Sequence, residues 1–350
     1  MAENLTAQQR ANLFSMSTRQ NLQMMAKQTA NTPNTSIEFT LPKARILSNI
    51  FVRVKAKVKV KHPSLTTLAV DALSPYRIIR RWSLDLNNGF MPWAISGEGA
   101  MLLNMLQPHA NVYMENSAYF DCDKTFTASS TGASNEFYFT VQLPVALNQR
   151  DPVGLILLQA DTMVADLRID IANPSDMFPS ASGYTFELEN IEATPMLETF
   201  SVPANASAMP DLSVLKLCTD RVDTITGAGQ QIVKLSTGTI YRKLLLYVTN
   251  ENGEPVDDDF ITSTIDLVFN EADCNYRISP DMLRAKNAFD LGHDLPKGFY
   301  IFDFTNQGFS NYGGVRDYID SERLTEFWVR FNTSGKGKVK IINECLSRLA

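Results

Sequence analysis

Strictly alternating polarity is the feature that most constrains the fold of this chain. From Ile50 to Val60, every second residue is apolar. The residues between them, up to Lys61, are all lysine or arginine except Phe51. Since successive side chains of a β-strand point to opposite faces, this pattern predicts a strand with one apolar and one basic face. The basic stripe Lys55–Lys61 fits a surface facing phosphate or lipid headgroups, a solvated outer face, or an edge strand guarded by lysine.

Short strand-like segments recur in two successive groups. The first comprises 76–86, 137–143, 153–159, 163–171 and 184–191, and the second comprises 212–217, 232–235, 240–249, 260–269, 299–304, 326–332 and 338–342. Two short helices, 96–107 and 280–289, are expected among them, so the regular alternation of an α/β protein is missing. We predict an all-β chain of two consecutive jelly-roll β-sandwiches, a double jelly roll, with an N-terminal helix and short inserted helices.

Length and local composition suggest the domain boundaries. A chain of 350 residues fits two domains better than one. Residues 3–30 lack proline and glycine and favour helix, which the segment Asn31-Thr32-Pro33 would end. The small, proline-bearing segment 201–211 is interpreted as a linker. We therefore expect an N-terminal helical arm at 1–35, a first jelly roll at 36–203 and a second at 204–350.

Two segments carry apolar residues that one sandwich core does not explain. The predicted N-terminal helix has two weak apolar faces, so it either lies between two surfaces or packs as a tail on its own domain. Residues 299–304 are apolar on both sides of a predicted strand. One side would face the sandwich core, and the other would face the sister domain or another subunit.

Charge and cysteine content narrow the class of protein. A net charge of −6 does not favour a surface that grips bare nucleic acid. The four cysteines are scattered, which is typical of reduced thiols. The polar N-terminus lacks the apolar core of a signal peptide, and no apolar stretch approaches the ~20 residues of a spanning helix. We expect a soluble protein that the general secretion route does not export.

Motifs for catalysis are sparse. His62, His109 and His293 are isolated from one another, and the G-x-S-x-G elbow of a nucleophilic serine is missing. The segment SGKGK at 334–338 lacks the Ser or Thr of a phosphate loop and is interpreted as a hairpin turn. The carboxylate pairs that a glycosidase would need occur at Asp121/Asp123, Glu187/Glu189 and within Asp257–Asp259. We interpret them as surface charge and expect no catalytic, cofactor-binding or metal-binding residue, no cofactor and no enzymatic activity.

Three segments resemble one known family. They are LTAQQRA at 5–11, LPVA at 143–146 followed by DPVG at 151–154, and LPKGFY at 295–300. In this order and spacing they are similar to tectivirus-type major capsid proteins over nearly the whole chain, closest to tectiviruses of Gram-positive bacteria. The resemblance implies a double jelly roll that trimerises into pseudo-hexagonal capsomers, which tile an icosahedral shell over an internal membrane.

The resemblance also implies partners and a membrane-proximal region. The N-terminal helix would lie at the base of the shell, so Arg10, Phe14, Arg19 and Lys27 are expected near the internal lipid membrane. The implied partners are the homotrimer, neighbouring capsid trimers and other virion proteins at the vertices, with no direct nucleic-acid contact. The protein would reside in the virion shell after assembly in the host cytoplasm. Two alternatives stay open: a virion spike or vertex protein, and a carbohydrate-binding β-sandwich protein.

Overall fold

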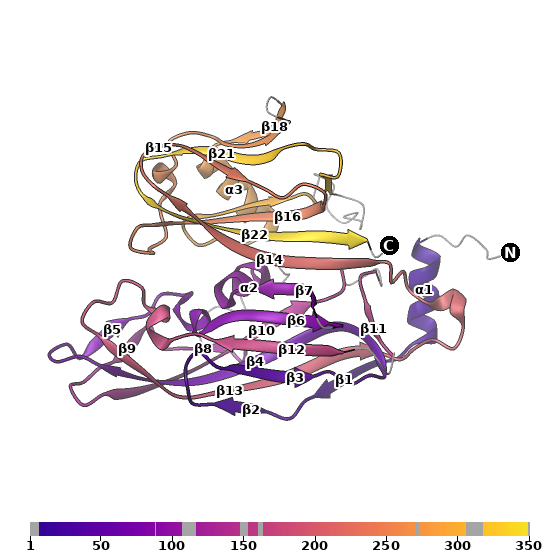
Figure 1. Ribbon diagram of the computed structural model, residues 1–350, viewed down its shortest axis with the longest axis horizontal. Coiled ribbons are helices and arrows are strands. Elements are labelled where there is room, and N and C mark those ends of the chain that lie inside the picture. The colour runs from indigo at the N-terminus through magenta and orange to yellow at the C-terminus, as the bar shows by residue number, and fades with distance from the viewer. Residues whose placement is uncertain are drawn as a thin grey trace. The chain divides into compact units, whose positions relative to one another are not determined.

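A computed structural model of the chain describes residues 7–87, 89–106, 117–147, 153–159, 164–270, 273–305 and 318–348. Contacts divide the chain into two compact units, Met1–Lys216 with Arg348–Ala350, and Leu217–Ser347. Strands dominate both units (Figure 1), as expected for an all-β protein. The domain boundaries expected at 35/36 and 203/204 stay predictions.

The first unit contains two main sheets. One has the order β1 (Gln20–Met24), β13 (Thr185–Phe200), β4 (Arg45–Lys61), β10 (Ala133–Pro144) and β8 (Phe120–Asp121), with β2 (Gln28–Ala30) on β13 and β11 (Ile156–Leu158) on β4. The other has the order β7 (Phe90–Ile95), β6 (Ile79–Leu86), β12 (Ala165–Ile171) and β3 (Ser36–Thr40). A small pair joins β5 (Thr67–Ala69) to β9 (Thr125–Thr127). Both main sheets contribute fully buried side chains, such as Phe139 and Trp82, as the two layers of a sandwich do.

The second unit repeats the plan. One sheet has the order β19 (Phe299–Asp303), β16 (Ile240–Asn250), β22 (Gly337–Arg348) and β14 (Val214–Ile225), with β20 (Ile319–Asp320) on β16. The other has the order β15 (Gly229–Lys234), β21 (Phe327–Thr333), β17 (Ile265–Phe269) and β18 (Asp273–Ile278). One buried cluster contains Leu244 and Ile341 from the first sheet and Leu267 and Val329 from the second. This cluster is the core of a second sandwich.

β4 shows how the alternating segment folds. Val52, Val54, Ala56, Val58 and Val60 are buried, while the residues that alternate with them are exposed or half-buried, so the predicted strand with one buried face is confirmed. β4 pairs with β10 along one side and with β13 along the other. Its backbone is therefore satisfied on both sides, and the interpretation of the segment as an edge strand is wrong.

The N-terminal segment differs from the predicted helix over 3–30. Among the described residues, the helix is α1 (Ala7–Ser17), and the chain then forms β1 and β2, which both pair with β13. β13 is long and needs partners for the backbone groups on the side away from β4. Helix propensities differ by only about 0.7 kcal/mol among ordinary residues, so this long-range pairing decides the structure.

The remaining helices and several strand ends also depart from the expected bounds. The inserted helices are α2 (Gly97–Asn104) and α3 (Pro280–Leu291), which confirms that each sandwich carries one. Short 3-10 turns occupy η1 (Ser74–Ile78), η3 (Pro174–Met177), η4 (Ala206–Ala208) and η5 (Asp258–Phe260). η1 occupies the start of the strand predicted at 76–86, η5 ends at the first residue of the strand predicted at 260–269, and η4 lies in the predicted linker. Among the described residues, no helix combines the length and apolar character needed to cross a membrane.

Each inserted helix is held to a strand by a pair of hydrogen bonds from one asparagine side chain, which we call the asparagine clamp. Asn104 Nδ2 donates to the carbonyl of Gln142 on β10 at 2.7 Å, and Asn104 Oδ1 accepts the Gln142 N–H at 2.8 Å. In the second unit, Asn287 Nδ2 donates to the Ile301 carbonyl at 2.9 Å, and Asn287 Oδ1 accepts the Ile301 N–H at 3.0 Å. Ser96 is the N-cap of α2 and Ser279 that of α3. Each asparagine follows its cap serine at the same spacing.

Removing this clamp is expected to weaken the second unit. In Asn287→Ala, the buried N–H and C=O of Ile301 lose their partners, and the free energy of unfolding should fall by roughly 2–3 kcal/mol. Chemical denaturation measures the loss, and amide exchange at Ile301 reports it locally. Asn252→Ala, in an exposed turn, is the matched control. An equal effect of both substitutions would contradict the role of the clamp.

The strand predicted to be apolar on both sides is β19. Every residue of β19 from Phe299 to Phe302 is buried. One side of β19 joins the core of the second unit, through Tyr300 and Phe302. α3 lies against the strand and holds it through Asn287 and Ile301. One side of β19 is therefore covered by the core of its own unit, and the expectation that the sister domain or another subunit covers the other side stays a prediction.

Candidate functional site

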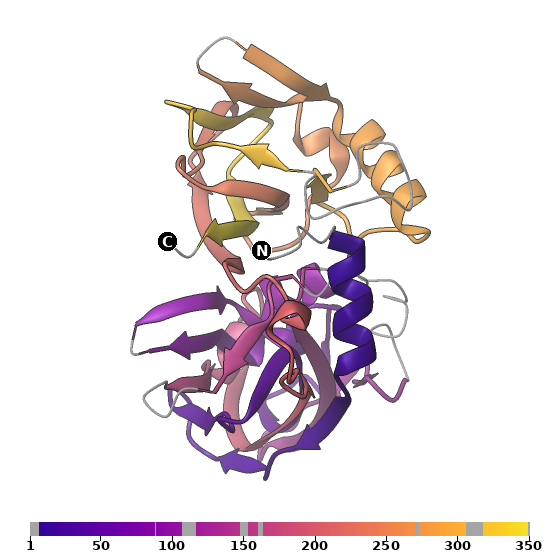
Figure 2. The same ribbon diagram turned by 90° about the vertical axis from the view of Figure 1, so that its right-hand side faces the viewer.

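α1 is attached to the first unit through Phe14. Its side chain is only 4% exposed and forms a buried cluster with Ile46 and Leu155. The Phe14 and Phe200 rings lie 5.2 Å apart, centroid to centroid, in an edge-on arrangement. Figures 1 and 2 show α1 beside the strands of this unit. Phe14 therefore packs on its own domain, which was one of the two arrangements expected for the segment.

Shortening Phe14 should release the helix without unfolding the unit. Burial of a phenylalanine side chain contributes roughly 1.5–3 kcal/mol, so Phe14→Ala should lower the free energy of opening α1 by about that amount. Limited proteolysis within 7–17 and amide exchange measure the change. Met16→Ala is the control, because Met16 is 85% exposed on the same helix. Equal protection of α1 in both variants would contradict this account.

The N-terminal segment also exposes apolar and basic side chains. Leu13 and Met16 on α1 are 37% and 85% exposed, and Leu22 and Met24 on β1 are 58% and 74% exposed. The basic residues Arg10, Arg19 and Lys27 are exposed as well. We call these seven residues the N-terminal surface. Its composition suits contact with a lipid headgroup layer or with another protein.

The charges of this surface are partly engaged by the protein itself. Lys27 Nζ lies 2.9 Å from Glu192 Oε2. Hydrogen bonds from Ser213 and the positive charge of Arg10 lower the pKa of Asp211. The backbone N–H of Arg19, rather than its charged side chain, donates to Ser201 Oγ at 3.0 Å and attaches the segment there. The predicted proximity of Arg10, Phe14, Arg19 and Lys27 to a membrane stays a prediction.

The basic stripe on β4 is interleaved with acidic side chains from both neighbouring strands. Lys55 Nζ lies 3.1 Å from Glu136 Oε1 on β10, and Lys57 Nζ lies 3.7 Å from Glu189 Oε2 on β13. The guanidinium of Arg53 lies 4.4 Å from the centre of the Tyr138 ring. A ladder of alternating charge has little net attraction for phosphate, so this face fits a solvated outer surface best.

The carboxylate pairs singled out in the sequence are used in ion pairs or lie exposed. Glu187 pairs with Lys61, whose hydrogen bond lowers the pKa of Glu187. Asp257 Oδ1 lies 2.6 Å from Lys297 Nζ. Asp121, Asp123 and Asp259 are exposed. Among the described residues, no group of His, Cys, Asp and Glu side chains is arranged to hold a metal ion.

The remaining titratable candidates are likewise structural. His62 Nδ1 accepts the N–H of Leu65 at 2.7 Å, in a loop, and His109 lies outside the described residues. All four cysteines remain thiols. Burial raises the pKa of Cys345 to about 12, and burial with the nearby Asp123 raises that of Cys122 to about 12. Thiols that stay protonated at neutral pH are poor nucleophiles.

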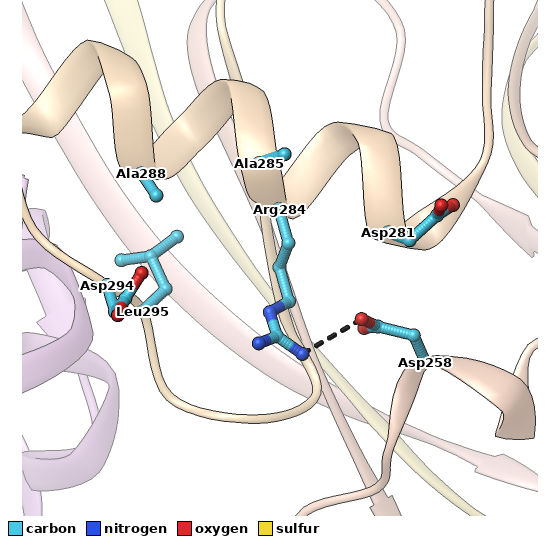
Figure 3. A pocket seen from close by; sticks show the side chains of 7 residues that line it. All are labelled: Asp258, Asp281, Arg284, Ala285, Ala288, Asp294 and Leu295. Atoms are coloured by element: carbon cyan, nitrogen blue, oxygen red, sulfur yellow. Dashed lines mark hydrogen bonds and ion pairs between the residues drawn. The ribbon is translucent and has the colours of Figure 1, made fainter.

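A small open pocket lies beside α3 (Figure 3). It has a volume of about 170 Å³ and is lined by Asp258, Asp281, Arg284, Ala285, Ala288, Asp294 and Leu295. Arg284 Nη1 lies 2.9 Å from Asp258 Oδ2, and the Tyr300 hydroxyl donates to Asp258 Oδ1 at 2.9 Å. Asp258 therefore links α3 to β19. The pocket is smaller than the roughly 300–1,000 Å³ of typical ligand sites, and its one arginine, Arg284, already pairs with Asp258.

The sequence analysis predicted the helix at 280–289 but not the exposed apolar face that α3 presents. Met282 is 63% exposed and Phe289 is 88% exposed, the most of any large apolar side chain in the described part of the chain. They are two helical turns apart and share one face. The signal was present in the sequence, because apolar residues at this spacing in a short capped helix indicate an apolar stripe.

Two successive β-sandwiches, each with one inserted helix held by an asparagine clamp, define a double jelly roll. The predicted fold is confirmed by comparison with solved structures. No protein-family model matches the sequence, and no curated protein sequence matches it either.

Three solved structures illustrate the similarity. The MCP of STIV, the Sulfolobus turreted icosahedral virus, has a TM-score of 0.69 at 17% identity, covering 94% of this chain and 97% of that chain. The Faustovirus major capsid protein has a TM-score of 0.63 at 10% identity, covering 95% and 90%. The major capsid protein P2 of bacteriophage PM2 has a TM-score of 0.54 at 11% identity, covering 95% and 98%. The similarity spans both units in each case.

Proposed function

We propose that the protein is a major capsid protein that builds the shell of an icosahedral virion. The observation that carries the proposal is the match of both jelly rolls, over 94% of this chain, to the MCP of STIV. The charge ladder, the ion-paired carboxylates and the small size of the pocket support a structural role. We accordingly expect no enzymatic activity and no cofactor.

The proposed building block is a homotrimer. Each chain supplies two similar sandwiches, so a closed ring of three chains presents six of them and has a near-hexagonal outline. Such tiles pack side by side into a shell. Neighbouring trimers and other virion proteins at the vertices are the proposed partners. The protein would be located in the virion shell, following assembly in the host cytoplasm.

The native mass of the purified protein tests this proposal. Light scattering should give about three times the chain mass of 39.1 kDa, without any added ligand. A monomer at every accessible concentration would count against a shell-forming role. It would favour the alternative of a carbohydrate-binding sandwich, which a glycan panel then tests. A trimer present at only a few copies per particle would favour a spike or vertex protein.

We also propose the finer assignment to a tectivirus-type capsid over an internal membrane, with a Gram-positive host. The segments LTAQQRA, LPVA with DPVG, and LPKGFY support it. The N-terminal surface supports it too, since it combines exposed methionines and leucines with Arg10, Arg19 and Lys27. In this proposal the basic residues and the exposed apolar side chains face lipid, while Phe14 holds α1 in place.

Binding to vesicles tests the membrane assignment. The protein should co-sediment with vesicles that contain anionic lipid, and Arg10→Gln with Arg19→Gln should weaken binding at low salt, because each basic residue contributes about 1 kcal/mol near such a surface. Lys55→Gln with Lys57→Gln, on the charge ladder, is the matched control. Equal binding by both double variants, or none by the wild type, would contradict the assignment.

A further inference from the structure

We propose that the outer face of α3, with Phe289 as its anchor, is the surface by which the second jelly roll of one chain contacts the next copy of the chain. The inference rests on the proposed function, because it names the contact that would close the trimer. Three observations support the inference. This face of α3 is exposed, the corresponding face of α2 in the first jelly roll is buried, and α3 is held rigidly.

The two jelly rolls can be matched through their helices. When Ser96 and Asn104 of α2 are placed on Ser279 and Asn287 of α3, Phe289 corresponds to Leu106. In the first unit the corresponding face is buried, with Leu102 at 0%, Leu103 at 6% and Leu106 at 8% exposure. In the second unit it is open, and comprises Met282, Ala285, Lys286 and Phe289, all of them exposed. One face of the same structural element is therefore covered in one roll and uncovered in the other.

The open face belongs to a well-fixed helix. α3 is clamped by Asn287 on Ile301 and tied by Arg284 to Asp258, and it ends at Gly292 in a left-handed conformation. Phe289 cannot turn inward without breaking these contacts, since the helix buries its opposite face through Leu283 and Asn287. A rigid helix that presents a large aromatic side chain has the form of an interface anchor.

The chemistry of the face indicates a second copy as the occupant. Lys286 and Asp290 form an ion pair beside Phe289, and Asp281 lies exposed at the start of the helix. This mixed, partly acidic rim does not suit an anionic lipid surface. In a closed ring of three chains, each second roll faces the first roll of the next copy. The face of α3 would then become covered, as its counterpart on α2 is covered within the chain.

The test compares the full-length protein with three variants by light scattering over a range of concentrations. Phe289→Glu should raise the concentration of half-dissociation more than tenfold, as expected for a central aromatic anchor. Phe289→Leu should keep most of the trimer. Ile232→Glu replaces another exposed apolar residue of the same unit, 49% exposed on β15, and should leave the trimer unchanged. Circular dichroism should show the same fold in all of them.

Peroxide oxidation followed by mass spectrometry supplies a second readout. Met282 should be oxidised more slowly in the wild-type trimer than in Phe289→Glu, while Met16 reacts at the same rate in both. A wild-type trimer that survives Phe289→Glu and leaves Met282 as reactive as Met16 would overturn the inference and leave the proposed function intact. A wild-type protein that is always monomeric would instead remove the proposed function itself.

Discussion

Gly298→Ala is expected to destabilise the second unit by roughly 3–5 kcal/mol. Gly298 has a φ of +70°, which costs an alanine roughly 1–2 kcal/mol. A Cβ at this position would also lie 2.4 Å from the carbonyl oxygen of Val248, so the start of β19 and the end of β16 would have to separate. The residue lies within the segment LPKGFY, and this close approach is a physical reason for glycine there.

Gly238→Ala is the matched control for this substitution. Gly238 has a φ of +79°, but nothing lies within 4 Å of the position its Cβ would take. Only the conformational cost applies, so the loss should be about 1–2 kcal/mol. Urea denaturation gives both values, provided the slope against denaturant is unchanged. Similar losses for the two variants would show that the contact with Val248 does not matter.

Arg77→Met is expected to destabilise the first unit by about 3–5 kcal/mol, because it leaves a buried carboxylate without its counter-charge. Arg77 Nη2 lies 2.8 Å from Glu98 Oε1, and Arg77 Nη1 lies 2.8 Å from Asp71 Oδ2. The side chains of Arg77 and Glu98 are only 11% and 10% exposed. Although burial lowers it, these two carboxylates raise the pKa of Arg77 above its usual value. The cluster fixes α2 to η1.

Two further variants make this result specific. Arg77→Met combined with Glu98→Gln should recover much of the loss, because the uncompensated charge is removed together with its partner. Arg168→Met breaks ion pairs of a side chain that is 49% exposed and should cost less than about 1 kcal/mol. Thermal and chemical unfolding measure all three. A loss in the double variant equal to that in Arg77→Met would contradict the role assigned to the buried charge.

Strands and their buried faces could be predicted from the sequence where hydrophobic periodicity alone determines them. The alternation in 49–61 predicted the buried and exposed faces of β4 because side-chain direction is a local property of a strand. The pairing partners of β4 could not be predicted, since strand pairing depends on residues far away in the sequence. The same limit explains the error over 3–30, where pairing with β13 converts a helix-favouring segment into β1 and β2. Burial of Phe14 by Phe200 depends on an equally distant contact.

The candidate site shows the same division. Sequence spacing placed Glu187 and Glu189 near each other, but only the register of β13 against β4 brings them to Lys61 and Lys57. The clamp residues Asn104 and Asn287 follow serine caps at equal spacing, a signal that the sequence contained. That signal has meaning only after the helices of the two halves are matched to each other. Exposure of Phe289 depends on tertiary structure and required the fold.

A three-dimensional reconstruction of the purified protein by electron microscopy tests the central claim most directly. A shell-forming double jelly roll should give a particle with threefold symmetry, a near-hexagonal outline and six similar lobes, two from each chain. The outer face of α3 should lie at the contact between chains. Single molecules, or a twofold dimer that leaves the second jelly roll without a neighbour, would contradict the account.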